Sequence, residues 1–180
     1  VADQPRPTAA AAIRGLKQLG LSTVMLSGDN KRTAGVIAGQ LGIDQVFSEL
    51  LPEQKLAMIA ELQRQAPTAM VGDGINDAPA LAGAAVGVAM GAAGSDTALE
   101  AADVVVMDDN PMRLLDLIRL SRSTWAVLWQ NIALALGIKG TFLLLTLVGS
   151  VTMWQAVFAD MGTSLMVIAN GLRLLRQRES

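Results

Sequence analysis

The sequence contains no cysteine, no histidine and no tyrosine among its 180 residues. The absence of cysteine excludes a disulfide framework and a thiolate metal site. Because histidine is absent as well, any metal site in this chain must use carboxylate, amide, carbonyl or thioether ligands. The net charge of −2 argues against a general nucleic-acid binder, which needs a basic face. We therefore expect no nucleic-acid partner.

Charge is also scarce in the last third of the chain. Residues 126–149 contain Lys139 as their only formal charge, and residues 151–170 contain only Asp160. About 20 mainly apolar residues span a bilayer, so each segment is predicted to be a transmembrane helix, with a short turn between them. A pair of buried helices in a soluble protein is the alternative, but it would leave too much apolar surface for a small domain to cover.

The regions that flank the two apolar segments are rich in arginine. Residues 111–125 are predicted to form an amphipathic cytoplasmic linker helix, and residues 171–180 a basic cytoplasmic tail. Because basic residues concentrate on the cytoplasmic side of a membrane, both open ends of the hairpin are expected in the cytoplasm. The arginines are Arg113, Arg119, Arg122, Arg173, Arg176 and Arg178.

Residues 1–110 alternate between short apolar runs and amphipathic stretches. This alternation predicts an α/β fold with a parallel sheet that is covered on both faces. In such sheets the reactive groups gather at the carboxyl ends of the strands. The expected strands are 23–26, 68–71, 86–88 and 104–106, and the expected helices are 9–19, 32–41, 52–65, 76–82 and 95–101.

The stretch from Gly72 to Pro79 is the most specific motif in the chain. It reads Gly-Asp-Gly-Ile-Asn-Asp-Ala-Pro and places Asp73 and Asp77 four residues apart around a turn that contains Gly72 and Gly74. Glycine lets the backbone approach a ligand closely, and Mg²⁺ is commonly bound by one or two carboxylates together with a substrate phosphate. The alternative is a solvated Asp-Gly turn followed by a capped helix.

Two weaker features could bind phosphate. Ser27, Gly28 and Asp29 follow an apolar run, where a hydroxyl and backbone amides can hold a phosphoryl oxygen. Lys55, three residues after Pro52, offers a positive charge for phosphate. Alone, the first could be an ordinary turn that caps the next helix, and the second a surface lysine.

Together, the hydroxyl, the lysine and the paired aspartates resemble the haloacid dehalogenase superfamily of phosphotransferases. The residue sequence of the Gly72–Pro79 stretch resembles a motif of the P-type ATPases in particular. Ser27-Gly28-Asp29 is similar to the Thr-Gly-Asp of that family, and Pro52-Glu53-Gln54-Lys55 to its Pro-x-x-Lys. The segment that contains Asp3 and Arg6 resembles the hinge that leads back from the nucleotide-binding domain. The resemblance covers the whole chain as a C-terminal piece of such a pump.

The resemblance implies a mechanism for the intact enzyme. An upstream aspartate accepts the γ-phosphoryl group of ATP, Ser27 and Lys55 hold the phosphoryl oxygens, and Asp73 ligates Mg²⁺ with the help of Asn76 and Asp77. Positioning and electrostatics supply most of the rate in this chemistry. The Asp-Lys-Thr-Gly-Thr motif that carries the acceptor does not occur here. The implied partners are therefore the lipid bilayer and the nucleotide-binding domain, the actuator domain and the earlier membrane helices of the same pump.

The charges within the apolar segments suggest the cargo. Placing a charged side chain within a membrane costs free energy, so such a charge indicates a functional role. A carboxylate is also an acceptable ligand for Zn²⁺. An aspartate at position 160 with Lys139 as its counter-charge resembles the arrangement in exporters of zinc, cadmium and lead, which implies a location in a bacterial inner membrane. A structural salt bridge is the simpler alternative. Met161 and Ser164 partly match a motif of the copper pumps, but Leu165 stands where a second serine is expected.

Two further functions remain open from the sequence alone. One is a phosphatase of the same superfamily with a membrane anchor, against which the missing acceptor motif counts. The other is a truncated, non-catalytic pump fragment that binds phosphate and Mg²⁺ or associates with a full pump.

Overall fold

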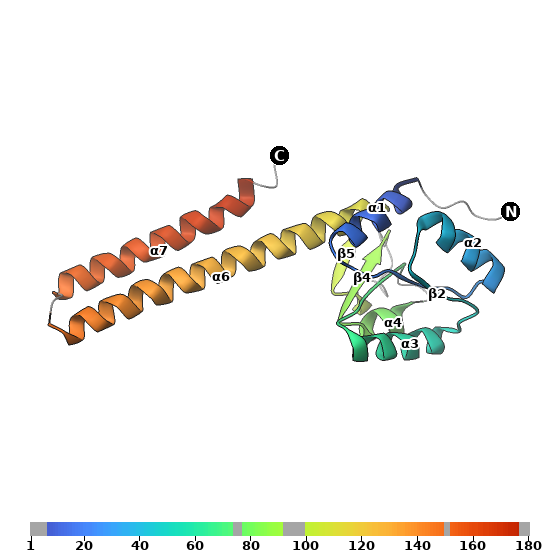
Figure 1. Ribbon diagram of the computed structural model, residues 1–180, viewed down its shortest axis with the longest axis horizontal. Coiled ribbons are helices and arrows are strands. Elements are labelled where there is room, and N and C mark those ends of the chain that lie inside the picture. The colour runs from blue at the N-terminus through green and yellow to red at the C-terminus, as the bar shows by residue number, and fades with distance from the viewer. Residues whose placement is uncertain (1–6, 74–76, 92–99, 150–151, 177–180) are drawn as a thin grey trace. The chain divides into compact units, whose positions relative to one another are not determined.

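The computed structural model describes residues 7–73, 77–91, 100–149 and 152–176. The chain divides into two compact units, Val1–Asp116 and Leu117–Ser180. The first contains α-helices and parallel strands, and the second consists of two long helices (Figure 1).

The first unit confirms the predicted alternation of strands and helices. Every strand pair in its described part is parallel, in two sheets with the orders β1-β2 and β3-β4-β5. The strand β2 was not predicted, and the predicted helix at 95–101 lies largely outside the described residues. The elements are α1 (Pro7–Gln18), β1 (Val24–Leu26), α2 (Lys31–Leu41), β2 (Gln45–Phe47), α3 (Pro52–Gln65), β3 (Ala69–Gly72), α4 (Ala78–Gly83), β4 (Val86–Met90) and β5 (Val104–Val106).

Local sequence signals determine where the helices begin and end. The side chain of Asn30 accepts a hydrogen bond from the backbone N–H of Thr33 and so caps α2. Gly42 ends that helix in the left-handed region, at a φ of 73°, which glycine adopts at little cost. Pro52 occupies the first turn of α3, where a missing N–H removes no helical hydrogen bond.

The core of the first unit lies between α3, α4 and the strand β3. Ile59, Met70, Ala80 and Leu81 form its buried cluster, and Leu26 of β1 packs against it. Helix α4 lies so close to β4 that a Cβ atom at Gly87 would be 2.6 Å from the carbonyl oxygen of Leu81. This packing fixes the position of α4, whose first turn follows Asp77.

In the second unit the predicted boundary at residue 125 does not interrupt the helix. A single helix, α6 (Met112–Leu147), runs through both the predicted linker and the first predicted membrane segment. The change from charged to apolar side chains at this boundary changes whether the helix surface favours water or lipid. The backbone hydrogen bonds of the helix continue across the boundary. The last helix is α7 (Met153–Arg176).

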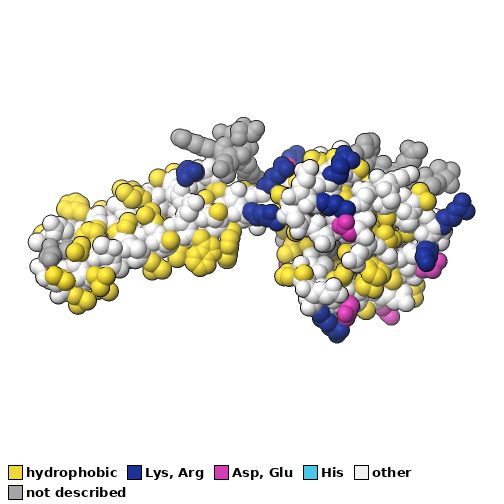
Figure 2. Space-filling model, in the orientation of Figure 1, with side chains coloured by type: hydrophobic (Ala, Val, Ile, Leu, Met, Phe, Trp, Pro, Cys, Tyr) yellow, Lys and Arg dark blue, Asp and Glu magenta, His cyan; other side chains and the backbone are white. Residues whose placement is uncertain are grey.

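The two helices of the second unit differ in apolar character. Within the described part of the chain, α6 is the one helix both long and apolar enough to cross a membrane, and its most apolar stretch is not buried. Helix α7 does not meet that criterion, because polar residues such as Gln155, Asp160 and Asn170 interrupt it. The second membrane span therefore stays a prediction. Apolar side chains nevertheless cover much of the visible surface of both helices (Figure 2).

Candidate functional site

The turn after β1 holds the side chain of Ser27 in place. Ser27 is buried, and its Oγ donates a hydrogen bond to Oδ2 of Asp29 at 2.8 Å and accepts one from the Asp29 backbone N–H at 3.1 Å. The carbonyl of Ser27 accepts from the N–H of Leu50, which ties this turn to the segment after β2. The predicted hydroxyl site is therefore an ordered turn at the carboxyl end of β1.

Asp77 lies close to the last residue of β3. Gly72 is the last residue of β3, and Asp73 follows it with an exposed side chain. A Cβ atom at Gly72 would be only 3.0 Å from Oδ2 of Asp77, so the carboxylate occupies space that a side chain at position 72 would need. Glycine at this position thus permits the close approach that the motif predicts.

Lys55 and Asp77 form the most enclosed ion pair of the described residues. Lys55 Nζ lies 2.7 Å from Oδ1 of Asp77, with side chains that are 14% and 16% exposed. Helix α3 supplies the lysine, and the first turn of α4 follows the aspartate, so the α3–α4 packing sets this distance. The structure thereby joins two of the residues that the sequence predicted separately.

The remaining predicted residues of the phosphate site divide into two groups. Ser27, Gly28 and Asp29 lie in one turn, and no hydrogen bond or ion pair among the described residues joins them to Lys55 or Asp77. Asp3, Arg6, Gly74 and Asn76 lie outside the described residues.

The second unit contains the predicted ion pair between the two long helices. Lys139 Nζ on α6 lies 3.1 Å from Oδ1 of Asp160 on α7, and both side chains are more than half exposed. They border a hollow of about 270 Å³ whose other walls include Phe142, Ala156 and Ala159. The pairing expected from the hairpin is therefore present, and it lies beside an open space.

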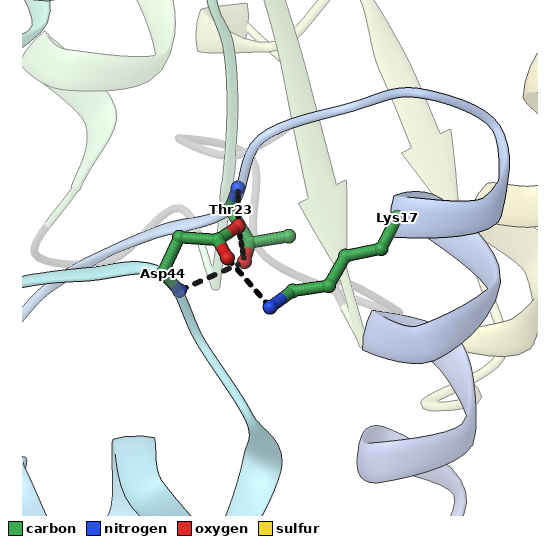
Figure 3. Close-up of polar contacts among 3 residues, drawn as sticks. All are labelled: Lys17, Thr23 and Asp44. Carbon is green, nitrogen blue, oxygen red and sulfur yellow. Dashed lines mark hydrogen bonds and ion pairs between the residues drawn. The ribbon is translucent and has the colours of Figure 1, made fainter.

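A further polar cluster lies at the amino ends of β1 and β2 (Figure 3). Asp44 Oδ1 accepts from Lys17 Nζ at 2.6 Å, and its Oδ2 accepts from the hydroxyl and the backbone N–H of Thr23. The hydrogen bond from Lys17, followed by those from Thr23, lowers the pKa of Asp44 from 3.8 to about 2. The sequence analysis missed this cluster, because its residues come from three separate segments and match no motif. Its place at the amino ends indicates a structural role.

The chain is similar to known proteins over nearly its whole length. Residues 1–85 match the family model of haloacid dehalogenase-like hydrolases. The zinc/cadmium/lead-transporting P-type ATPase of Escherichia coli is 51% identical over 98% of this chain. The cadmium, zinc and cobalt-transporting ATPase of Bacillus subtilis is 47% identical over the same share. Nearly the whole chain is thus similar to P-type ATPases.

The similarity to P-type ATPases extends to the fold of nearly the whole chain. A crystal structure of a zinc-transporting PIB-type ATPase in the E2.Pi state is similar, with a TM-score of 0.91 and 50% identity over 96% of this chain. The chain covers 28% of that structure, and 24% and 26% of the relatives from E. coli and B. subtilis. It therefore spans about a quarter of the length of the pumps that it matches.

Proposed function

We propose that this chain is the phosphoryl-binding and membrane part of an ATP-driven exporter of zinc, cadmium or lead. The observation that carries the proposal is the presence, in one chain, of two separate ionic sites. Lys55 and Asp77 form an enclosed pair in an α/β unit, and Lys139 and Asp160 form a pair between two apolar helices. A pump needs one site for phosphoryl transfer and another for the ion.

The phosphoryl site needs an acceptor that the chain does not supply. Leu26 of β1 packs against the cluster that contains Met70 of β3, yet β1 and β3 are not paired with each other in the described structure. Both strands thus have an unpaired edge above a shared core. We propose that a strand from an upstream segment pairs there, and that the acceptor aspartate follows it at the carboxyl edge, near Ser27 and Asp73.

The donor set of this edge fits Mg²⁺. Asp73 and Asp77 offer hard carboxylate oxygens, and this ion commonly takes one or two carboxylates with substrate phosphate oxygens and water. The described residues contain no group of three or more His, Cys, Asp or Glu side chains that could hold a metal ion by themselves. When bound, Mg²⁺ would neutralise charge on the phosphoryl group; Asp73 would be its main protein ligand.

The residues of the chain have distinct tasks in this proposal. The two hydrogen bonds with Asp29 position Ser27 Oγ before the phosphoryl group arrives, and its O–H would turn from the Asp29 carboxylate to the phosphoryl oxygen. Lys55 holds Asp77 in place and brings a positive charge to the site. This arrangement lowers the cost of organising the site at the moment of transfer, which is how electrostatic catalysis gains its rate.

Asp160 is the proposed ligand of the transported ion. A lone carboxylate at membrane depth is costly, and Lys139 offsets that cost while no metal is bound. When a divalent cation enters the hollow beside the pair, it competes with Lys139 for the carboxylate. The displaced ammonium then repels the metal and favours its release. The bacterial relatives support a bacterial inner membrane as the location, with the α/β unit in the cytoplasm.

The two sites can be tested separately in a full-length pump that contains this chain. Asp73→Ala should abolish the phosphoenzyme formed from ATP, while Asp116→Ala, which removes an exposed aspartate, serves as the control. Asp160→Ala should leave phosphorylation from inorganic phosphate intact and abolish ATPase activity stimulated by zinc. Normal phosphoenzyme in Asp73→Ala would refute the Mg²⁺ role, and normal zinc stimulation in Asp160→Ala would refute the ligand role. Turnover of phosphate esters without metal stimulation would favour a phosphatase instead.

A further inference from the structure

Helices α6 and α7 pack along a narrow stripe of residues that are half-buried or, at Thr163, buried. In each helix these residues recur at alternating steps of three and four, with one repeated step of four, which is typical of a seam between two helices. On α6 the stripe consists of Val127, Asn131, Ala135, Ile138 and Phe142. On α7 it consists of Ala156, Ala159, Thr163, Val167 and Asn170. Most members are apolar or small, and one asparagine stands on each side.

The two asparagines are hydrogen-bonded to each other across the seam. Asn170 Nδ2 donates to Oδ1 of Asn131 at 2.9 Å, and also to Oε1 of the exposed Gln130 at 3.3 Å. Arg173 Nη1 donates to Oδ1 of Asn170 at 3.2 Å. A guanidinium group has donors and no acceptor, so the atom that faces Arg173 must be the oxygen. The amide nitrogen of Asn170 is thereby directed at α6.

This contact lies in the same antiparallel register as the ion pair. Asn131 lies eight residues before Lys139, and Asn170 lies ten residues after Asp160, which corresponds to about 12–15 Å along the helices. A shift of α7 by one turn, about 5.4 Å, would separate both pairs. A polar asparagine in an otherwise apolar seam is known to specify register, because an apolar seam can pack in several ways.

We propose that the Asn131–Asn170 hydrogen bond locks the register of the hairpin and thereby keeps Asp160 opposite Lys139. The ion pair is exposed and borders a hollow, so it can open for a ligand. The amide pair lies within the packed seam and keeps the helices aligned while the ion pair is open. The register role stands on its own; its consequence for transport rests on the proposed role of Asp160.

Disulfide cross-linking of the full chain in membranes tests the register directly. The sequence has no cysteine, so introduced pairs form without competition. Seven residues after Asn131 lies Ile138, and seven before Asn170 lies Thr163, so the pair Ile138→Cys and Thr163→Cys reports the native register. The pair Ile138→Cys and Val167→Cys reports a shift of one turn. The yield of each pair is measured after mild oxidation without added metal.

Asn170→Leu should raise the ratio of shifted to native cross-link by about 3-fold to 20-fold, the range that measured hydrogen bonds between membrane helices imply. Asn170→Ala removes the amide without adding bulk and should shift the ratio in the same direction, which covers poor insertion of the leucine variant. Because Asn131 and Asn170 act through one bond, Asn131→Leu combined with Asn170→Leu should change the ratio no more than either alone. Gln130→Leu, which removes the longer and exposed contact, is the matched control and should have little effect.

The ion pair provides the decisive comparison. Lys139→Met combined with Asp160→Asn should leave the native cross-link dominant, because the amide pair still holds the register. An unchanged ratio in both Asn170 variants would overturn the proposal, and so would a larger shift in the ion-pair variant than in Asn170→Leu. Neither result depends on metal transport, so failure here is distinguishable from failure of the proposed pump function.

Discussion

The ion pair between Lys55 and Asp77 allows a quantitative prediction. Lys55→Met keeps most of the length of the side chain and removes its charge, which leaves the carboxylate of Asp77 without its cation. The two side chains are only 14% and 16% exposed, so water can replace the lost partner only in part. We therefore expect this substitution to destabilise the segment where α3, β3 and α4 meet.

The expected size follows from the degree of burial. An exposed ion pair contributes about 0–1 kcal/mol, whereas loss of one partner from a buried pair costs about 3–5 kcal/mol. The Lys55–Asp77 pair lies closer to the buried limit, and we expect Lys55→Met to cost about 2–3 kcal/mol. Adding Asp77→Asn removes the stranded charge, so the double variant should be more stable than the sum of the single effects predicts, by about 1–2 kcal/mol.

Amide hydrogen exchange is a suitable assay, because all three tryptophans lie in α6 and α7 and their fluorescence does not report on this unit. Peptides from α3 and β3 should exchange roughly 30-fold to 150-fold faster in Lys55→Met, given tenfold per 1.4 kcal/mol. Arg64→Met, which breaks an ion pair with side chains 77% and 54% exposed, is the control and should change exchange by less than about twofold. Exchange in Lys55→Met that matches this control, or strictly additive effects in the double variant, would refute the reasoning.

Two further predictions concern the first unit. Hydrogen bonds from Lys17 and Thr23 lower the pKa of Asp44 to about 2. The contribution of Asp44 to stability is therefore present above the unfolded pKa of about 3.8 and is lost as the pH falls through about 2. Acid unfolding of Asp44→Asn should lack this pH dependence, and an acid transition identical to that of the unsubstituted protein would contradict the prediction. Gly87→Ala should lower stability by about 1–3 kcal/mol, because the new Cβ would meet the Leu81 carbonyl; an unchanged thermal midpoint would show that α4 moves aside freely.

Much of the fold could be predicted from the order of apolar runs and turns. The strands β1, β3, β4 and β5 each begin with or contain several apolar residues, and glycine or proline marks the ends of the helices. The strand β2 was missed, because Gln45–Phe47 is only three residues long and two of them are exposed. The continuity of α6 was not predicted either, because amino-acid composition indicates whether a helix surface favours water or lipid and does not indicate where the helix ends.

The candidate site was predicted residue by residue but not as a set of contacts. The motifs identified Ser27, Lys55 and Asp77, yet the pairing of Lys55 with Asp77 depends on how α3 packs against α4 across 22 residues of sequence. The Lys139–Asp160 pairing could be predicted, because a hairpin with a short turn fixes which positions meet. The Asn131–Asn170 contact follows from the same geometry, but it was not predicted, because uncharged amides in an apolar segment match no motif.

In the part of the chain that the structure describes, β1 and β3 each have an unpaired edge, and this affects how the protein can fold. Unpaired strand edges are sites where foreign chains can add and aggregation can begin. If an upstream strand fills that place, the unit completes its fold only when a distant part of the polypeptide returns to it. Its stability is then linked by mass action to that segment, as it would be to a bound ligand. Expressed apart from it, the α/β unit should be poorly soluble, and a separately supplied peptide with the missing strand should act as its chaperone.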